Sequence, residues 1–259
     1  MDNIAVSIRK PKKENYKEII DAIASAGFKN VFIEWYNKDL KLQEKVLRYV
    51  KLKGLNIIFA HLNFINCNHI WEENTMGDDT INSFLKDILY LKNSGINDYI
   101  IHTTYKFNDP KVTDIGIKRI KKLARSAKLI NARICFENVE LQGYLEGILE
   151  NVNDDNVGIC FDVGHSHLFF KEKINTSMFK DRMFHIHLHD NFGENDDHNI
   201  HFDGNVNWKK SINQIKEANY RGYITIETSK NKKYDNLTYI EFYKKVKEVA
   251  DELKKLIEK

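Results

Sequence analysis

The sequence predicts an α/β protein in which eight parallel strands, each followed by a helix, close into a (β/α)8 TIM barrel. Three observations predict this fold: short apolar segments alternate with amphipathic ones, the alternation repeats eight times, and 259 residues suit a single barrel domain spanning 1–259. A doubly wound open sheet is the alternative. It is less favoured because no G-x-G-x-x-G motif follows a predicted strand.

Each predicted strand is a short apolar run, as in NVFIEW and YITIET. The seventh differs from the rest, since His185, His187 and His189 alternate with aliphatic residues at the period of a strand. One face of that strand is therefore imidazole and the other is aliphatic. In chain order, the predicted strands are residues 4–8, 30–35, 56–61, 98–103, 132–138, 156–162, 185–189 and 223–228.

The segments between the strands repeat apolar residues at helical spacing. Three of them end near Gly27, Gly54 and Gly95, and glycine is typical of a helix C-terminus. A loop containing Trp71 precedes the third helix, and we expect this aromatic loop to be exposed and suited to an interface. The predicted helices are residues 14–26, 40–53, 80–93, 118–130, 141–151, a brief helix around 177, 208–219 and 239–258.

Composition limits the partners and the compartment. The chain has 40 Lys and Arg against 37 Asp and Glu, with the signs interspersed, which argues against a dedicated nucleic-acid-binding arm. Its three cysteines show no C-x-x-C spacing and fit a reducing compartment. No apolar run is long enough to cross a membrane. We therefore expect a cytoplasmic protein without membrane contact, and an oligomer is compatible with the sequence.

Polar side chains stand at the ends of most predicted strands, where the active sites of such barrels lie. In strands five, six and eight they alternate with aliphatic residues, so they should face the barrel interior together. Carboxylates meeting there would repel one another, and buried carboxylate or imidazole groups would stay unsatisfied without a cation. We therefore predict a cation-binding group of residues, hereafter the central cluster: Glu137, Asp162, His187 and Glu227.

Other polar residues carry weaker implications. His61 ends the third strand and His102 the fourth, and each taken singly is more typical of a hydrogen-bonded core residue than of a ligand. Glu34 ends the second strand and is equally compatible with a structural role and with substrate binding. We expect His185 and His201 to be structural. Alternation alone does not choose between the last two histidines of the seventh strand as the ligand.

Five motifs lie at or after the later strand ends: FEN (136–138), FDVGH (161–165), HLHDN (187–191), DDHNIHFDGNVNW (196–208) and ITIET (224–228). As an ordered set they resemble the xylose isomerase-like TIM-barrel superfamily and, within it, the sugar phosphate isomerase/epimerase group. The resemblance implies that the central cluster binds one divalent ion, namely Mn²⁺, Zn²⁺, Mg²⁺ or Co²⁺. The motif places its histidine ligand three residues before Asp190, which selects His187. His189 stands where many relatives carry Asn or Lys, and His165 is implied to contact substrate oxygens.

The implied reaction is the isomerisation or epimerisation of a small sugar, a sugar phosphate or a polyol. Two glutamates of the central cluster, Glu137 and Glu227, would flank a hydroxy-carbonyl unit of the substrate. One would take a proton from carbon and the other would return it, while the metal stabilises the enediolate.

The same superfamily includes apurinic-site nucleases of the endonuclease IV type, which use three zinc ions and act on DNA. The glutamate at position 34, the isomerase-like FDVGH and the balanced charge favour the isomerase over this alternative. A barrel that binds metal without catalysis is a third reading, made less favoured by the two intact glutamates. The additional zinc ligands under the nuclease alternative would be His61, His102, His165, Asp196 and His198.

Overall fold

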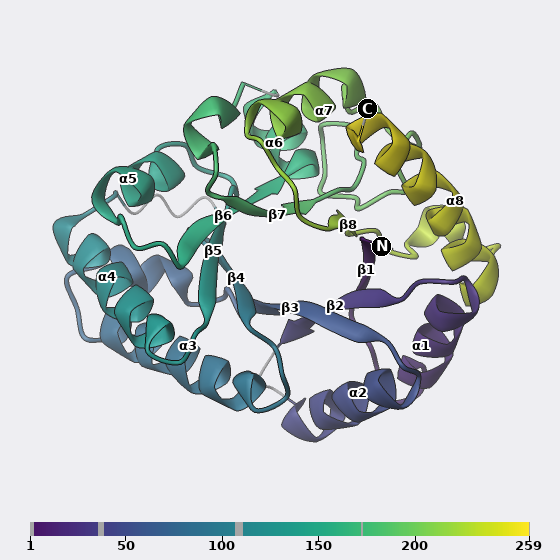
Figure 1. Cartoon of the computed structure of the whole chain (residues 1–259), viewed down its shortest axis with the longest axis horizontal. Helices are drawn as coiled ribbons and strands as arrows, with labels where there is room; N and C mark the ends of the chain where they lie inside the picture. The colour runs from purple at the N-terminus through teal and green to yellow at the C-terminus, as the bar shows by residue number, and fades with distance from the viewer. Residues whose placement is uncertain (1–2, 36–38, 107–110, 172, 259) are drawn as a thin grey trace.

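Eight parallel strands form one sheet that curls into a barrel, with helices around its outside (Figure 1). The computed structural model describes residues 3–35, 39–106, 111–171 and 173–258. Neighbouring strands follow chain order from β1 to β7, and β8 pairs with β1. The barrel closes between β7 and β8, where Leu188 bridges Ile226 and its N–H donates to the Thr225 carbonyl at 2.9 Å. The predicted (β/α)8 TIM barrel is therefore confirmed.

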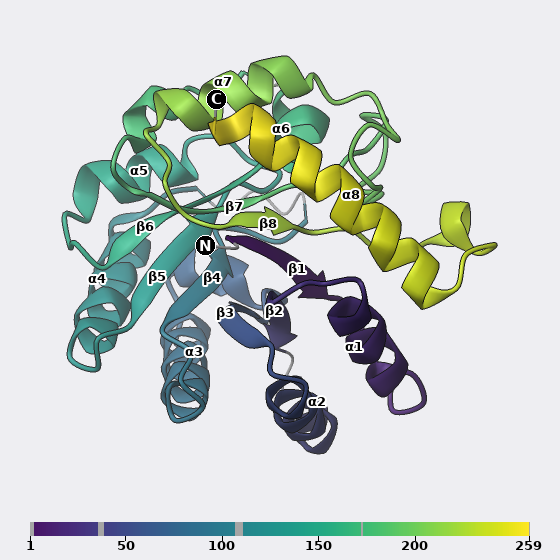
Figure 2. The ribbon, with the colours of Figure 1, turned by 45° about the vertical axis from the view of Figure 1, so that its right-hand side comes forward.

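The strands are β1 (Ile4–Ile8), β2 (Asn30–Trp35), β3 (Asn56–Leu62), β4 (Asp98–His102), β5 (Arg133–Glu137), β6 (Val157–Asp162), β7 (Met183–His187) and β8 (Ile224–Ile226). The α-helices are α1 (Tyr16–Ser25), α2 (Leu40–Leu52), α3 (Met76–Lys92), α4 (Asp114–Lys128), α5 (Tyr144–Asn151), α6 (Val163–Phe170), α7 (Trp208–Glu217) and α8 (Tyr239–Glu258). Three short 3₁₀ helices are η2 (Cys67–Trp71), η3 (Thr176–Phe179) and η4 (Lys232–Tyr234). Helix α8 packs on β1, β8 and α1, which brings the two described ends of the chain together (Figure 2).

Two local expectations differ from the structure. The sixth helix is α6, directly after β6, and the brief helix expected around residue 177 is only the 3₁₀ turn η3. The apolar residues of helix α6 are spread around the helix and do not form one apolar face. Helical periodicity in the sequence therefore gave no signal for it. It begins because the Asp162 side chain accepts a hydrogen bond from the His165 N–H and caps the helix. Strand β7 also ends at His187, which leaves His189 beyond the strand.

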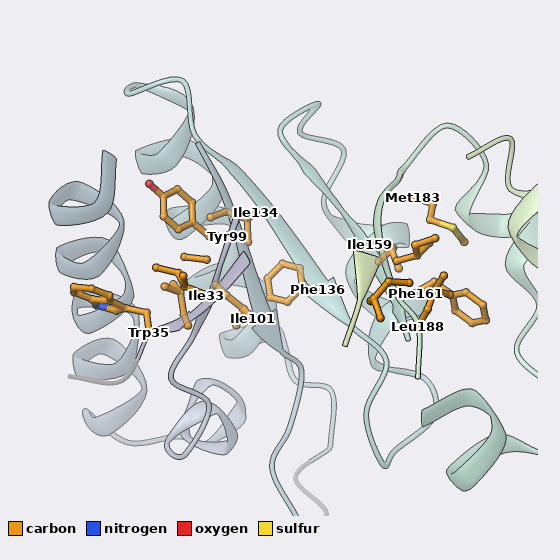
Figure 3. Packing of buried hydrophobic residues seen from close by; sticks show 14 of the residues in the cluster. Ile33, Trp35, Tyr99, Ile101, Ile134, Phe136, Ile159, Phe161, Met183 and Leu188 are labelled. Atoms are coloured by element: carbon orange, nitrogen blue, oxygen red, sulfur yellow. The ribbon is translucent and has the colours of Figure 1, made fainter. Parts of the chain in front are cut away.

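The core has two parts, and they follow the alternation of the strands. Outward-facing residues such as Ile134, Phe136 and Phe161 pack between the strands and the helices (Figure 3). Inward-facing residues form a smaller group inside the barrel, in which the Phe32 and Phe59 rings stack with centroids 4.5 Å apart. These residues fill the middle of the barrel, so its polar chemistry lies at the two ends.

Trp71, in the loop before α3, is buried, which corrects the expectation that this aromatic residue is exposed. Only 2% of Trp71 is exposed, and its indole N–H donates to the Thr103 carbonyl at 2.8 Å. Gly116 of α4 lies against the ring, because a Cβ there would come within 2.3 Å of it. Tyr144 of α5 packs edge-on against the same ring. Tight packing on α4 and α5 thus takes this ring out of reach of a partner. Across the described ranges, no helix is both long and apolar enough to span a bilayer.

Candidate metal centre

The carboxyl ends of four neighbouring strands bring the central cluster together. Glu137 ends β5, Asp162 ends β6, His187 ends β7, and Glu227 directly follows β8. One ligand atom from each residue lies within 4.8 Å of the other three. His187 Nδ1 lies 2.9 Å from Glu137 Oε1, 3.5 Å from Glu227 Oε2 and 3.7 Å from Asp162 Oδ2. The structure thus joins all four residues that the sequence selected.

The central cluster has an excess of buried negative charge, with three carboxylates around one imidazole. Burial alone would lower the pKa of His187, but the Glu227 and Glu137 carboxylates raise it to about 9. Asp162 Oδ2 is buried and has no hydrogen-bond partner among the described residues. A divalent cation would supply both the missing charge and the missing partner, so the residues present fit a metal ion.

A second group of residues meets the opposite side of Glu137. Its Oε2 lies 3.0 Å from His61 Nε2 and 3.2 Å from His102 Nε2, while Oε1 faces the central cluster. His102 also stacks on Phe64, with ring centroids 4.2 Å apart. Burial lowers the pKa of His102, which favours the neutral imidazole that a metal requires. His61, His102 and Glu137 therefore meet at one place, where their side chains could hold a metal ion together.

A third group, hereafter the outer cluster, lies beside Asp162 and consists of His165, His189, Asp196 and His198. His198 Nε2 lies 2.8 Å from Asp196 Oδ2, and His165 Nε2 lies 3.6 Å from the same oxygen. Potential ligand atoms lie within 4.8 Å of one another in two overlapping sets that share His189. The first set is Asp162, His165 and His189. The second set is His189, Asp196 and His198.

Three of these histidines have the same orientation. The Nδ1 atoms of His61, His165 and His198 lie 3.0, 2.9 and 2.8 Å from the carbonyl oxygens of Leu62, Asn138 and Glu227. A carbonyl only accepts hydrogen bonds, so each Nδ1 carries the proton. Each Nε2 is then directed towards a carboxylate. Metal-binding histidines are commonly fixed by such a second hydrogen bond.

Asp190 shapes the loop that carries the outer cluster, and sequence reasoning missed this role. Its carboxylate accepts hydrogen bonds from the backbone N–H groups of Phe202 and Val206 at 2.9 and 3.1 Å, and from the Trp208 indole at 2.9 Å. Its backbone pairs in antiparallel fashion with Asn199. These bonds fold residues 191–207 back over the barrel mouth. The acidic residue after a histidine-rich strand was the only sequence signal for this role.

Arg9 connects two glutamates at the rim, which sequence reasoning also missed. Its Nη1 lies 2.8 Å from Glu227 Oε1, and its Nε lies 3.4 Å from Glu34 Oε1. Burial acts to raise the pKa of Glu227, but His187 and Arg9 lower it to about 2. Glu34 therefore lies at the rim and contacts Arg9, and it joins none of the three groups above. The signal for Arg9 was its place directly after β1.

The site lies in a cavity of about 210 Å³ that opens beside a larger groove of about 860 Å³. Lys10, Asp196 and His198 line both spaces, so the outer cluster stands at their junction. The groove is also lined by Phe192, Asn195, Asn199, Asn205, Lys232 and Lys233. A small polar molecule in the cavity could thus extend one end into the groove.

Residues 20–258 match the sequence model of a family described as "Xylose isomerase-like TIM barrel". Among curated proteins, an uncharacterized protein of Sinorhizobium fredii is 31% identical over 111 residues, which cover 42% of this chain and 35% of that protein. An uncharacterized protein of Methanocaldococcus jannaschii is 31% identical over 130 residues, covering 45% of this chain and 44% of that protein. The match thus spans less than half of either relative.

Several solved structures share the fold over nearly the whole chain. A D-tagatose 3-epimerase-like protein has a TM-score of 0.72 and 21% identity, covering 99% of this chain and 98% of its own. A D-psicose 3-epimerase of Clostridium cellulolyticum, solved with D-tagatose, has a TM-score of 0.73 and 12% identity, covering 98% and 99%. The IOLI protein, solved with a zinc atom, has a TM-score of 0.74 and 15% identity, covering 97% of both chains. At these identities the likeness shows the barrel fold.

Proposed function

This chain belongs to the xylose isomerase-like TIM-barrel family, and from that premise we propose that it is a metal-dependent isomerase or epimerase of a small sugar, polyol or sugar phosphate. The central cluster carries the proposal, because two glutamates meet one aspartate and one histidine at a single buried point. Sugar 3-epimerases among the proteins of similar fold support the same reaction class.

The proposed metal ligands are the four residues of the central cluster. Their mixed oxygen and nitrogen donors suit Mn²⁺, Mg²⁺, Co²⁺ or Zn²⁺. A bound divalent ion would polarise the substrate carbonyl and stabilise the negative charge that develops when the adjacent carbon loses a proton. Asp162 and His187 would only hold the ion, because Glu137 and Glu227 line the cavity and these two residues are not part of its lining.

The two glutamates would move the proton. Each directs one oxygen to the central cluster, Oε1 for Glu137 and Oε2 for Glu227, while its other oxygen is held by neighbouring cations or imidazoles. Arg9 holds Glu227, and the pair His61 and His102 holds Glu137. Fixed in this way, one carboxylate would take the proton from one side of the substrate and the other would return it.

The cavity supports a small polyhydroxylated substrate. Its rim carries Arg9, Glu34 and His165, which could bind hydroxyl groups. An unphosphorylated sugar would occupy the cavity alone, and a phosphorylated one would extend its phosphate towards Lys10 and the groove.

Deuterium exchange tests the proposal. The metal-loaded protein would be incubated in D₂O with a panel of ketoses, their phosphates and keto derivatives of inositols, and NMR would follow deuterium at the carbon beside the carbonyl. We expect exchange in at least one member of the panel, and Glu227→Gln should abolish it because the variant cannot accept the proton. Glu252→Gln on the exposed face of α8 is the matched control and should exchange normally. Exchange that persists in Glu227→Gln would refute the role of Glu227.

One observation favours a second candidate, an apurinic-site nuclease of the endonuclease IV type. Glu137 contacts two histidines on its far side, and the outer cluster adds further nitrogen ligands. This arrangement is suited to several metal ions, which commonly activate phosphate esters. Metal analysis distinguishes the candidates, since the nuclease would hold about three zinc ions per chain. Fully zinc-loaded protein that fails to incise abasic duplex DNA would exclude the nuclease.

A further inference from the structure

Asn138 joins the ends of two strands that carry residues of the central cluster. It is 2% exposed and directly follows Glu137, the last residue of β5. Its Nδ2 donates to the Asp162 carbonyl at 2.8 Å, and its Oδ1 accepts from the Asp162 N–H at 2.7 Å. The amide therefore uses both its nitrogen and its oxygen on one residue of the neighbouring strand.

These two bonds continue the sheet beyond the end of β5. The last residue pair between β5 and β6 joins Glu137 to Cys160, which lies two residues before Asp162. Beyond that pair, a side chain rather than the backbone of β5 binds the N–H and C=O of Asp162. An amide can do this because it offers a donor and an acceptor, as a peptide group does. A carboxylate lacks the donor and an aliphatic side chain lacks both, so the position suits asparagine.

The residue that Asn138 fixes directs its carboxylate into two places. Asp162 Oδ2 lies 3.7 Å from His187 Nδ1 in the central cluster, while Oδ1 accepts from the His165 N–H at 2.6 Å and caps α6. A shift of the Asp162 backbone would move both oxygens together. Because Asn138 is also the next residue after Glu137, its amide sets the spacing between two ligands from neighbouring strands.

The main chain of Asn138 also holds His165. The Asn138 carbonyl lies 2.9 Å from His165 Nδ1 and accepts the proton of that nitrogen. His165 lines the cavity, and Asn138 is not part of that lining. Asn138, Asp162 and His165 thus form a closed triangle of hydrogen bonds in which each residue binds the other two. Buried networks of this kind hold their members in a single arrangement.

We propose that Asn138 is a positioning residue for the metal-dependent reaction. Its amide places the Asp162 carboxylate beside Glu137 for a divalent ion, and its carbonyl orients the His165 imidazole at the edge of the cavity. Asn138 acts through these two neighbours, as residues that orient metal ligands commonly do. The inference rests on the proposed function, because it assigns a role within that site.

Asn156 provides a matched control at the opposite end of β6. It directly precedes the strand and is 8% exposed, and its Nδ2 donates to the carbonyls of Ala124 and Ala132 at 2.9 and 3.1 Å. It is thus another buried amide that binds backbone groups, at the end of β6 remote from the central cluster. Truncating either asparagine leaves buried polar groups without partners, so both variants should be destabilised. A loss of stability alone would therefore not distinguish positioning from support of the fold.

Metal affinity makes that distinction. Equilibrium dialysis with Mn²⁺ and the visible absorption of Co²⁺-loaded protein would be measured for wild type, Asn138→Ala and Asn156→Ala, with urea unfolding as the measure of stability. We expect Asn138→Ala to bind Mn²⁺ roughly 10- to 100-fold more weakly and to show an altered cobalt spectrum. Asn156→Ala should keep the wild-type affinity and spectrum. Equal affinities in the two variants would overturn the role of Asn138.

NMR of the metal-free protein provides a second readout. The ring nitrogens of labelled His165 should show a protonated Nδ1 in wild type, and their resonances should shift in Asn138→Ala but not in Asn156→Ala. If Asn138→Ala does not fold, hydrogen exchange in wild type decides, because the Asp162 N–H should exchange slowly and rapid exchange would overturn the proposal. Wild-type protein that binds no divalent metal would contradict the proposed function itself. Normal metal binding and deuterium exchange in Asn138→Ala would contradict only the role of Asn138.

Discussion

Two histidines of one strand point into the same barrel and meet opposite surroundings. His185 Nε2 lies 2.7 Å from Asp98 Oδ2, and Arg133 donates to the same carboxylate. Two residues later, His187 Nδ1 faces three carboxylates. We call Asp98, Arg133 and His185 the lower cluster, because they lie towards the amino ends of the strands.

The difference between the lower and central clusters is one of charge balance. Burial acts to raise the pKa of Asp98, but hydrogen bonds from His185 and Arg133 bring it to about 2, so one carboxylate faces one guanidinium. Burial lowers the pKa of His185, which stays neutral. Each cluster holds a buried atom without a hydrogen-bond partner among the described residues, His185 Nδ1 in the lower cluster and Asp162 Oδ2 in the central one. Only the central cluster has a surplus of carboxylates. Inward polar residues therefore act structurally where their charges are paired, and form a site where they are not.

The largest difference between the central and lower clusters should appear when metal is added. A metal that binds only the folded chain should stabilise it by about 4 kcal/mol at a free concentration of 1,000 times its Kd. Asp162→Asn should lose roughly half of this gain or more, since it removes a charged ligand from the central cluster. Urea unfolding with metal and with chelator would measure the gain. Asp98→Asn applies the same change to the lower cluster and should keep the full gain, so a parallel loss there would contradict the distinction.

Removing the carboxylate of the lower cluster should have the next largest effect. Asp98→Ala leaves His185 buried without its partner and Arg133 without its bidentate acceptor. We expect a loss of about 3 kcal/mol in the free energy of unfolding, as for other broken buried pairs. Equilibrium unfolding would measure this loss, and dialysis would measure bound metal. The number of bound ions should stay at the wild-type value, and a reduced number would show that the two clusters are coupled.

The pH dependence of the metal-free protein should separate the two histidines. The folded pKa of His187 is about 9, against an ordinary value of 6.5, so its stabilising contribution is complete below about pH 6.5 and is lost as the pH rises through 9. We expect a decrease of about 3 kcal/mol over this range. The pKa of His185 is lowered, so its contribution is lost in the opposite direction, as the pH falls.

The variant His187→Asn identifies the source of the alkaline loss. Asp162 and Asp196 outweigh burial and raise the pKa of His165 as well, so a smaller alkaline decrease should remain in this variant. Unfolding experiments in chelator across the pH range would measure both curves. An identical slope in the two proteins would show that His187 is not protonated in the folded metal-free state.

The fold and the central cluster could be predicted because both depend on alternation within short strands. In β5, Ile134 and Phe136 pack outward while Glu137 points inward, and the sequence contains that pattern directly. The same rule locates Asp162 and Glu227. The direction of each side chain can be predicted from its own strand alone, and the barrel fold then brings the strand ends together.

The other contacts described above could not be predicted, because they join segments that are far apart in the sequence or depend on the path of a loop. Asp98 and His185 are 87 residues apart, and nothing near either residue indicates that they meet. Arg9 contacts Glu227 across the seam where the first and last strands join. The alternation of strand residues did not predict the direction of the His189 side chain, because β7 ends at His187 and His189 lies in the segment that follows. Sequence periodicity has no information about such contacts.

The smallest expected effect is that of His185→Gln, which belongs to a matched pair of glutamine substitutions on β7. In His185→Gln, the amide group can still donate to Asp98, so the cost should be about 1 kcal/mol and metal binding should not change. In His187→Gln, the same side chain replaces an imidazole surrounded by three carboxylates, and the metal-dependent gain in stability should fall sharply. Unfolding with and without metal would measure both variants under identical conditions. Because the two positions share a strand, a direction and a degree of burial, only their neighbours differ. If both variants lost the metal-dependent gain equally, charge balance would not be what separates a structural histidine from a ligand in this barrel.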